Sequence, residues 1–449
     1  MDKYLKALVI GAISFTVFYG VTRMVLGFSI FRIGAALDVS ARMGAKLACS
    51  GYYLSGLNAQ QNIDDLASYS PANRLLTINY DNGAKRVTAN LKGLAEQSAT
   101  YREGLGCTLD IGDTTALDSL QNTPLPPIAA AWPKGEQVDS IEPNIQNILD
   151  GLLQQDNLNG KQSRAMLVVK NGSIVAESYA EGFDQNSKLL GWSMGKSITA
   201  MMLGRLEQMG QVILDQTTGF PQWQNDARKD ITLIDLLQMS SGIAFDETYA
   251  PGTDATNMLF HAHSASDVAL TGTANHDIGS HFNYSSGTTN ILSRWLYDHL
   301  GGAQQQLDFF KQEFLEPLGM RNTIFEVDPS GVYVGSSYIY ASARDWARLG
   351  LLMLNNGNLH GQQLLSPEFV KAAQTPIDAD NYQKYGYQFW LNSDMQDTRW
   401  ERLPKDAYMM MGNRKQIVMI IPSENMVIVR LGWTSGSYPT EANFAQLIE

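Results

Sequence analysis

Ser193-Met194-Gly195-Lys196 places a lysine three residues after a serine. On a helix this spacing brings both side chains to one face. If the helix starts at the serine, the hydroxyl lies where backbone N–H groups and the positive end of the helix dipole converge. The lysine then lies one turn in, where burial can lower its pKa until it accepts the hydroxyl proton. The spacing therefore indicates a lysine-activated serine nucleophile.

The same residues allow a second interpretation, because residues 191–195 (GWSMG) match Gly-x-Ser-x-Gly, the nucleophile elbow of α/β-hydrolases. That elbow needs a buried strand just before the serine. Residues 184–188 (DQNSK) are polar instead, and no alternating βαβ pattern surrounds them. The helix that the lysine mechanism needs is plain, because an apolar stripe at helical spacing follows the serine: Ile198, Met202, Leu206 and Met209. We therefore favour the lysine mechanism.

A lysine-activated serine also needs a group that carries the proton to the leaving atom, and Tyr284-Ser285-Ser286 contains two candidates. A tyrosine whose pKa is lowered by a nearby lysine can shuttle protons, and the Ser286 hydroxyl can point into the same cleft from a loop. The alternative is structural: Ser285 or Ser286 caps a helix over residues 289–300, and Tyr284 only packs. Taken alone, these residues favour the structural interpretation, because Tyr-x-Ser is a common pattern.

An oxyanion hole needs backbone N–H groups that approach the substrate closely. Gly412-Asn413 precedes an expected strand at residues 416–421, and glycine permits such an approach. The Asn413 N–H can then join that of Ser193 in binding the oxyanion. An ordinary turn at the entrance of the strand is the alternative.

The expected secondary structure after residue 124 is that of a mixed α+β domain. A hairpin over residues 166–176 precedes the Ser193 helix, and a long helical and loop-rich stretch covers residues 230–375. Two strands, at 416–421 and 426–431, close the domain. Strands at both ends with helices between them predict one antiparallel sheet whose first and last parts meet, with a helical subdomain inserted.

Three ordered motifs carry a family resemblance: Ser193/Lys196, then Tyr284/Ser286, then Met410-Met411-Gly412. Residues 236–242 (LLQMSSG) and 343–350 (ARDWARLG) support it. Together they resemble the serine β-lactamase and penicillin-binding-protein superfamily, in particular its class C β-lactamase-related esterases and 6-aminohexanoate-oligomer hydrolases. The resemblance covers about residues 125–449 and implies a β-lactamase/transpeptidase-like α+β fold. In that fold an antiparallel sheet is flanked by helices, and the cleft lies between the sheet and a helical subdomain.

The resemblance implies four catalytic residues, namely the nucleophile, its base, the proton relay and a support of that relay: Ser193, Lys196, Tyr284 and Ser286, in that order. It also implies that Gly412 and Asn413 form the oxyanion side of the cleft. Residues 245–249 (FDETY) resemble the loop before the cleft in the oligomer hydrolases, which implies that Tyr249 contacts the substrate.

One position departs from the family pattern. In true β-lactamases and D,D-peptidases the third motif begins with Lys or His, a cation that can engage a substrate carboxylate. Here that position is Met410, which we expect to border the substrate without charge. We therefore expect weak or absent action on β-lactams and D-Ala-D-Ala peptides. A neutral ester, or an amide that lacks that carboxylate, is favoured.

These features predict a serine hydrolase that forms an acyl-enzyme with an ester or amide, of the carboxylesterase or amide-oligomer hydrolase type. A penicillin-recognising D,D-peptidase or β-lactamase is one alternative, and a non-catalytic membrane-anchored binding or scaffold protein with the same fold is the other. The net charge of −12 argues against nucleic acid as a partner. No phosphate loop or dinucleotide motif is present, and His261 and His263 lack an acidic or cysteine cluster, so we expect no cofactor and no metal.

Residues 1–32 are expected to form an N-terminal transmembrane anchor or signal. Residues 7–22 carry no charge, and passage beyond Arg23 makes the apolar length sufficient for a span. A cleaved signal peptide is the alternative, but no clear small-x-small site follows. We expect a single-pass protein of the bacterial inner membrane with a periplasmic catalytic domain, although positive residues lie on both sides of the segment.

Residues 33–123 are expected to form a small extracytoplasmic module. A hairpin is predicted over residues 76–91, because apolar and polar residues alternate on both sides of Asn82-Gly83. The two cysteines of the chain, Cys49 and Cys107, both lie in this module, and a disulfide between them would stabilise its small core; two reduced thiols are the alternative. Residues 123–127 (TPLPP) read as a linker to the hydrolase domain, residues 124–449.

Overall fold

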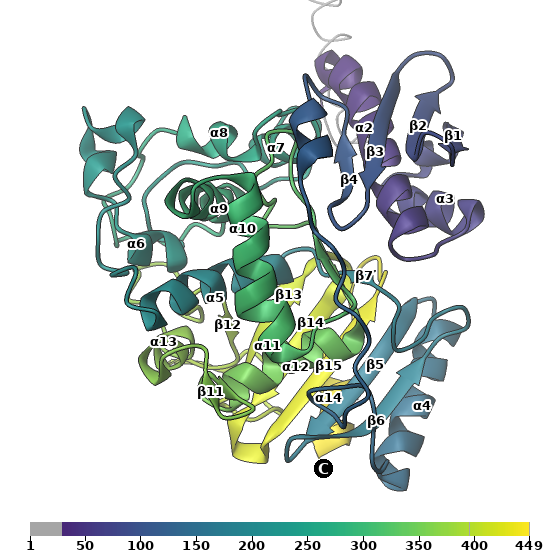
Figure 1. Cartoon of the computed structure of the whole chain (residues 1–449), viewed down its shortest axis with the longest axis vertical. Coiled ribbons are helices and arrows are strands. Elements are labelled where there is room, and N and C mark those ends of the chain that lie inside the picture. The colour runs from purple at the N-terminus through teal and green to yellow at the C-terminus, as the bar shows by residue number, and fades with distance from the viewer. Residues whose placement is uncertain (1–28, 395, 449) are drawn as a thin grey trace, which may run out of the picture.

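The expected hydrolase domain, residues 124–449 and here called the catalytic part, is built on one six-stranded antiparallel sheet. The computed structural model describes residues 29–394 and 396–448. The sheet has the strand order β12-β13-β14-β15-β5-β6, with these bounds: β5 (Ser163–Lys170), β6 (Ser173–Tyr179), β12 (Trp390–Leu391), β13 (Tyr408–Gly412), β14 (Gln416–Ile421) and β15 (Met426–Gly432). β15 pairs with β5, so the first hairpin and the last strands meet as the sequence predicts (Figure 1).

Helices cover both faces of this sheet. On one face α4 (Pro143–Leu158) packs against β5 and β6, and α14 (Thr440–Ile448) packs beside α4. On the other face α12 (Ala343–Leu354) crosses β14, β15 and β5, and α5 (Met194–Gln208) contacts β13. Strands whose side chains alternate between two covered faces read as continuous apolar runs, which is why β14 and β15 are buried along their whole length.

A mostly helical subdomain lies beside α5 on the side away from the sheet (Figure 1). Its helices are α6 (Leu233–Leu237), α7 (Asp254–Phe260), α8 (Ala265–Leu270), α9 (Ser286–Leu300), α10 (Ala303–Phe310) and α11 (Glu316–Leu318), with a π-helical turn at Lys311–Leu315. A small sheet connects the subdomain to α5 and α12: β7 (Leu189–Leu190), β9 (Ile339–Ala341) and β8 (Thr323–Phe325). β10 (Asn358–Leu359) lies beside α12 and pairs with β11 (Gln362–Gln363), and α13 (Pro367–Ala373) places Phe369 against Gly204 of α5. The 3₁₀ turns are Ile30–Arg32, Pro71–Leu75, Thr115–Ser119, Pro221–Trp223, Ala227–Asp230, Asn413–Lys415 and Pro422–Glu424.

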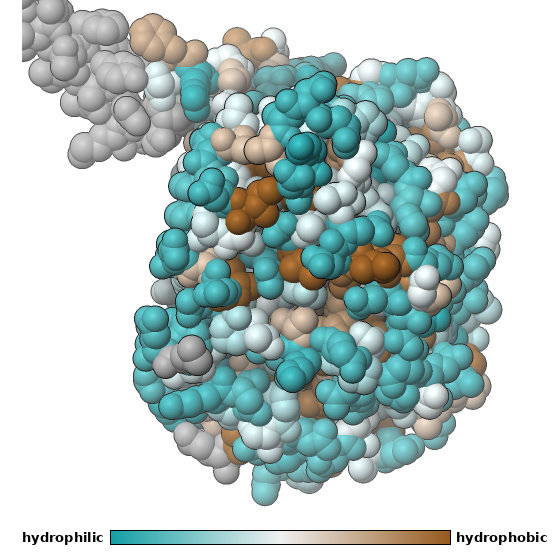
Figure 2. Space-filling model, turned by 90° about the vertical axis from the view of Figure 1, so that its left-hand side faces the viewer, coloured by the Kyte–Doolittle hydropathy of each residue, from teal (hydrophilic) through white to brown (hydrophobic). Residues whose placement is uncertain are grey.

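Polar residues cover most of the molecular face on the left-hand side of Figure 1, and apolar residues gather in small patches near the middle of that face (Figure 2).

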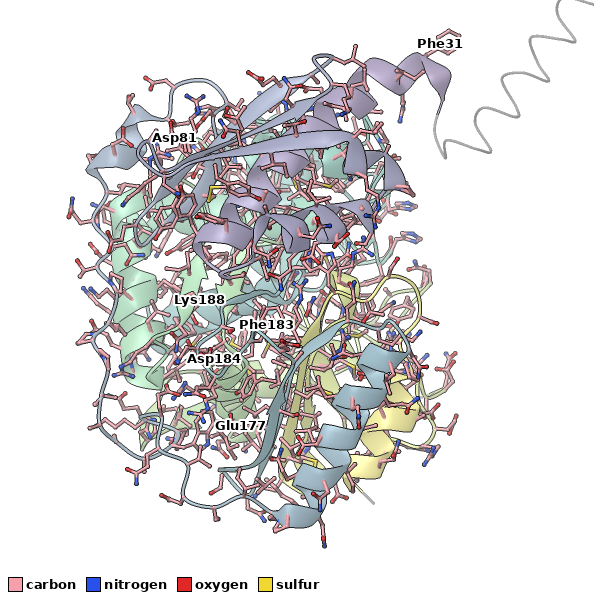
Figure 3. All side chains as sticks on the ribbon, turned by 90° about the vertical axis from the view of Figure 1, so that its right-hand side faces the viewer. Phe31, Asp81, Glu177, Phe183, Asp184 and Lys188 are labelled. Carbon is pink, nitrogen blue, oxygen red and sulfur yellow. A yellow bond between two sulfur atoms is a disulfide. The ribbon has the colours of Figure 1, made fainter. Side chains whose placement is uncertain are left out.

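An N-terminal module packs on the catalytic part (Figures 1 and 3). Helix α2 (Ile33–Tyr53) lies across a four-stranded antiparallel sheet, followed by α3 (Ala59–Ala67). The strands are β1 (Leu76–Asp81), β2 (Arg86–Leu91), β3 (Glu96–Arg102) and β4 (Gly106–Leu109), and β1 and β2 form the predicted hairpin. Cys49 of α2 is joined to Cys107 of β4 by a disulfide with a Cα–Cα distance of 6.0 Å, which confirms the predicted pairing.

Residues 343–350, which support the family resemblance, fasten the segment that follows the linker. Arg348 donates to the carbonyls of Pro133 and Gly135, both at 2.7 Å. Arg344 donates to the carbonyl of Glu136 at 2.7 Å. Trp346 is fully buried and lies beneath the turn that precedes the serine nucleophile. This stretch therefore holds two separate segments in place, namely residues 133–136 and the turn before Ser193.

No helix within residues 29–394 and 396–448 has the length and apolar character needed to cross a bilayer. The apolar segment at residues 7–22, for which a membrane anchor is predicted, lies outside the described residues.

Candidate active site

Ser193 lies at the N-terminus of α5, in a turn whose shape is set by its neighbours. The turn follows β7, and a Cβ on Gly191 would lie 2.2 Å from Cζ2 of Trp346, so only glycine fits there. Trp192 has a left-handed backbone with φ of +49°, uncommon for a bulky residue and held here by burial of the indole. The nucleophile thus follows a tightly determined backbone and borders an open cleft.

Lys196 is fully buried one turn into α5, and its Nζ contacts three oxygen atoms. Nζ lies 3.1 Å from Ser193 Oγ, 2.9 Å from Ser286 Oγ and 3.2 Å from the carbonyl oxygen of Ser336. Desolvation of the charged amine lowers the pKa of Lys196 to about 8, and the negative charge of Glu247 opposes this shift. A substantial fraction of the amine is therefore neutral near physiological pH, as a general base requires.

Glu247 organises the far side of this lysine. Its carboxylate accepts hydrogen bonds from the Ser286 hydroxyl at 2.6 Å, the Ser286 N–H at 2.7 Å and the Tyr249 hydroxyl at 3.0 Å. The carboxylate also occupies the N-terminus of α9, where the helix dipole favours negative charge. Sequence reasoning missed Glu247, although it lies in the loop at 245–249 that was singled out for Tyr249.

Both interpretations of Tyr284-Ser285-Ser286 describe part of what the structure contains. Ser285 is the N-cap of α9, because its side chain accepts the Thr288 N–H at 3.0 Å. Ser286 is the first residue of that helix, and its hydroxyl joins Lys196 to Glu247. The helix therefore starts three residues earlier than predicted. Ser285 caps it, and the hydroxyl of Ser286 points toward Lys196.

The pKa of Tyr284 is shifted in the direction opposite to the predicted one. The Lys196 amine lies over the tyrosine ring, 4.8 Å from its centroid, and not beside the hydroxyl. Burial of the hydroxyl, followed by the negative charge of Glu247, raises the pKa of Tyr284 above its usual value, while a hydrogen bond with Ser193 acts in the other direction. Tyr284 is thus a neutral phenol that lines the same cleft as Ser193.

Gly412 brings the edge strand β13 against the nucleophile turn. A Cβ at Gly412 would lie 2.1 Å from the carbonyl oxygen of Gly191, so a side chain there would separate the two segments. Asn413 follows directly and borders the same cleft as Ser193. The close approach places two backbone segments at one site, as an oxyanion hole requires.

Met410 does not border the cleft as expected. Its side chain is fully buried in the main core, because residues on a strand alternate between faces and Met410 points toward α5. Its neighbour Met411 lines the cleft instead. Because Met410 does not line the cleft, its lack of charge says nothing about the charge that a substrate meets there.

The cleft has a volume of about 270 Å³. It is lined by Ser193, Glu247, Tyr249, Tyr284, Trp390, Arg399, Met411, Gly412 and Asn413. Trp390 and Arg399 were not predicted, because they belong to β12 and the following loop, whose position depends on the completed sheet. The Arg399 guanidinium lies 5.1 Å from the Trp390 ring, which lies 5.0 Å from that of Tyr284.

Gln388 is a second residue that the sequence does not indicate. Its side chain is buried, donates to the carbonyls of Leu236 and Leu237, and accepts from the Thr289 hydroxyl at 2.8 Å. Its backbone carbonyl accepts from Ser197 at 2.6 Å. Gln388 thus joins α5, α6 and α9 around the candidate catalytic side chains.

Comparisons with known proteins agree with this architecture. The family model described as beta-lactamase matches residues 149–446. A curated relative, the 6-aminohexanoate-dimer hydrolase of Paenarthrobacter ureafaciens, is 25% identical over 222 residues, which are 46% of this chain and 56% of the relative; the match thus spans little more than half of the relative's length.

Solved structures show the same fold. EstCE1, a hydrolase with promiscuous acyltransferase activity, superposes with a TM-score of 0.56 at 14% identity and covers 68% of this chain and 97% of that one. A penicillin-binding protein homologue from Caulobacter crescentus superposes with a TM-score of 0.54 at 17% identity and covers 70% of this chain and 98% of that one. All of the candidate catalytic residues lie within residues 149–446, whereas the disulfide-bonded module lies outside them.

Proposed function

The chain belongs to the beta-lactamase family, and from that premise we propose that it is a serine hydrolase that cleaves an ester or amide through an acyl-enzyme. The observation that carries the proposal is the contact of the Lys196 amine with Ser193 Oγ at 3.1 Å, together with a pKa of Lys196 lowered to about 8. A serine at a helix N-terminus with an adjacent neutral amine is an activated nucleophile.

Hydrogen-bond directions around Lys196 favour the base role. The Ser286 hydroxyl donates to the Glu247 carboxylate, which only accepts, so Ser286 must accept from Lys196. The Ser336 carbonyl also accepts from Lys196. A neutral amine has two N–H bonds and one lone pair, and these two contacts use both N–H bonds. The lone pair then faces Ser193 and accepts its proton.

The proposed reaction proceeds in two halves. Ser193 Oγ attacks the carbonyl carbon as Lys196 takes its proton, and the N–H groups of Ser193 and Asn413 bind the oxyanion. Tyr284 passes a proton to the leaving group, which departs and leaves the acyl-enzyme. The Lys196 ammonium then returns its proton to Tyr284, so both groups are neutral again. In the second half neutral Lys196 takes one proton from water, directly or through Tyr284, as the water oxygen attacks the acyl carbon. That proton passes to Ser193 Oγ as the acid leaves, which restores the free enzyme.

The rate is expected to follow the charge of Lys196. kcat/KM for a p-nitrophenyl ester should rise about tenfold per pH unit below the Lys196 pKa of about 8 and level off above it, since only the neutral amine accepts a proton. Glu247→Gln removes a charge that favours the ammonium form, so its inflection should occur at lower pH. Asp246→Asn, at the exposed neighbouring carboxylate, is the matched control. An inflection of Glu247→Gln at higher pH would contradict the assignment.

Arg399 gives the cleft a cation away from the reacting atoms. Its Nη2 donates to the Tyr382 hydroxyl at 2.5 Å, and no acidic residue pairs with it in the described part of the chain. The acids of the same loop, Asp394 and Asp397, pair with Lys384 instead. The sequence favours a neutral ester, or an amide that lacks the carboxylate bound by the third-motif cation. We extend the proposal to substrates that carry a carboxylate near Arg399, remote from the scissile bond.

Arg399→Gln is expected to raise KM about tenfold for a p-nitrophenyl ester whose acyl chain ends in a carboxylate, because the guanidinium provides charge-assisted hydrogen bonds. KM for p-nitrophenyl butyrate, which is neutral, should change by less than about twofold. The ratio of the two KM values measures the contribution of Arg399 to binding of the carboxylate, because a general loss of binding would change both KM values equally. Equal changes for both esters would refute the carboxylate role.

A parallel assay separates the proposed function from its alternatives. Turnover of p-nitrophenyl acetate and butyrate without turnover of nitrocefin supports the esterase or amidase. Nitrocefin turnover supports a β-lactamase or penicillin-recognising peptidase. A protein that turns over neither, and whose Ser193 is not labelled by a fluorophosphonate, is the scaffold alternative.

We also propose that the catalytic domain works in an oxidising compartment, with residues 1–32 as its membrane anchor. The Cys49–Cys107 disulfide supports this location, because such bonds persist outside the reducing cytoplasm. A reporter fused after Glu449 and read for periplasmic or cytoplasmic activity tests the orientation.

A further inference from the structure

Tyr69 of the N-terminal module contacts residues next to the candidate active site. Tyr69 follows α3, and the Arg414 guanidinium lies over its ring, 3.7 Å from the ring centroid. On other sides the same ring contacts Trp192 at 6.3 Å and Trp433 at 5.8 Å between centroids, both edge-to-face. Trp192 directly precedes Ser193, and Arg414 directly follows Asn413. One side chain thus touches the neighbours of both proposed oxyanion donors.

The backbone at these neighbours needs external support. Trp192, Arg414 and Lys415 all adopt left-handed backbone, with φ of +49°, +60° and +65°, and none is glycine. Such conformations persist only where the surroundings hold them. Arg430 donates to the carbonyls of Arg414 and Lys415 at 3.1 and 3.0 Å and so holds this turn from the sheet side. Tyr69 contacts the Arg414 side chain and is the module's contribution to holding it.

The module is fastened to the catalytic part on several sides of Tyr69. Asp65 pairs with Arg164 of β5 at 2.5 Å, and its carbonyl accepts the Trp433 indole N–H at 3.0 Å. Ser55 donates at 2.5 Å to the carbonyl of Lys188, which lies in the segment that leads into the nucleophile turn. These contacts fix the position of the Tyr69 ring relative to Ser193.

We propose that Tyr69 is a positioning residue for the oxyanion hole, supplied by a module outside the part of the chain that the family model matches. Its ring sets Trp192 and Arg414 so that the N–H groups of Ser193 and Asn413 point at one oxygen. The inference rests on the proposed function for its kinetic consequence. Misaligned donors weaken transition-state binding and leave ground-state binding nearly unchanged, so kcat should fall while KM holds.

The test compares Tyr69→Leu, which keeps apolar volume but removes the ring, with Tyr69→Phe, which keeps the ring. Tyr69→Leu should lower kcat for p-nitrophenyl butyrate about 10- to 100-fold, with KM changed by less than about twofold. It should weaken inhibition by phenylboronic acid, whose tetrahedral adduct occupies the oxyanion hole, by a similar factor. Tyr69→Phe should restore most of both. Val87→Ala, on β2 in the buried core of the module, controls for general destabilisation.

Hydrogen exchange provides a readout that does not depend on activity. Tyr69→Leu should speed amide exchange in peptides spanning 190–195 and 411–416, and Val87→Ala should not. If Tyr69→Leu does not fold, Arg414→Met removes the other partner of the contact and should give the same pattern. Unchanged exchange in these peptides, or a loss confined to KM, would overturn the proposal. If Tyr69→Leu alters exchange but a fluorophosphonate does not label Ser193 of the wild type, the hydrolase assignment is overturned. The role of Tyr69 in positioning these two segments then still stands.

Discussion

Replacement of Ser193 by alanine is expected to abolish labelling by a fluorophosphonate probe and to lower kcat/KM for a p-nitrophenyl ester at least about 10⁴-fold. The loss is large because Ser193 is the only serine that lines the cleft in the described part of the chain. Ser286 also contacts Lys196, but its side chain is fully buried and does not line the cleft, so it cannot reach a substrate carbonyl. Ser193→Ala should keep the wild-type fold, since the side chain makes no N-cap hydrogen bond.

Ser187→Ala is the matched control for this loss. Ser187 lies in the loop before the nucleophile turn, and its hydroxyl contacts only Asp184 within that loop. This variant should be labelled at the wild-type rate. The decisive measurements are intact-protein mass after probe treatment and the rate of ester hydrolysis. A Ser193→Ala protein that still gained the probe mass would move the nucleophile elsewhere and end the lysine mechanism proposed for this site.

The residues that the sequence predicts best are those fixed by local spacing. Ser193 and Lys196 are one helical turn apart, so any helix that starts at the serine brings them together. The antiparallel order of β15 against β5 follows equally from strands at both ends of a helical stretch. In both cases a short-range pattern determines the geometry.

Other features depend on tertiary packing and are not written in any short pattern. Arg399 reaches the cleft because β12 pairs with β13 and turns its loop toward Trp390. Glu247 acts on Lys196 only because its loop folds against the start of α9. The direction of the Tyr284 pKa depends on which part of the ring faces the amine, and spacing in the sequence does not specify that.

The module and the catalytic part also share a buried ion pair, which gives the second large expected effect. Lys46 of α2 pairs with Glu326, and both side chains are almost completely inaccessible to solvent. Glu326 also accepts the Cys107 N–H at 2.7 Å and the Ser50 hydroxyl at 2.8 Å. Lys46→Met would leave the carboxylate buried without its cation, and we expect a loss of about 3–5 kcal/mol in the free energy of unfolding.

Two variants show whether the unpaired charge causes this loss. In Lys46→Met/Glu326→Gln the amide oxygen can still accept from Cys107 and Ser50, but no charge is buried, so part of the stability should return. Arg42→Met, one turn earlier on α2, breaks a more exposed pair with Asp38 and should cost less than about 1 kcal/mol. Urea titrations of all three variants beside the wild type measure these differences.

The pH dependence of the Lys46→Met defect provides the sharper discrimination. Burial already raises the pKa of Glu326, and the positive charge of Lys46 is the largest influence that opposes this shift. Without Lys46 the folded-state pKa rises further above the unfolded value, so the folded protein binds the extra proton. Stability is then present below the unfolded pKa and is lost as pH rises through the folded one. The defect should therefore be smaller near pH 5 than near pH 8, whereas a simple packing defect would be equal at both.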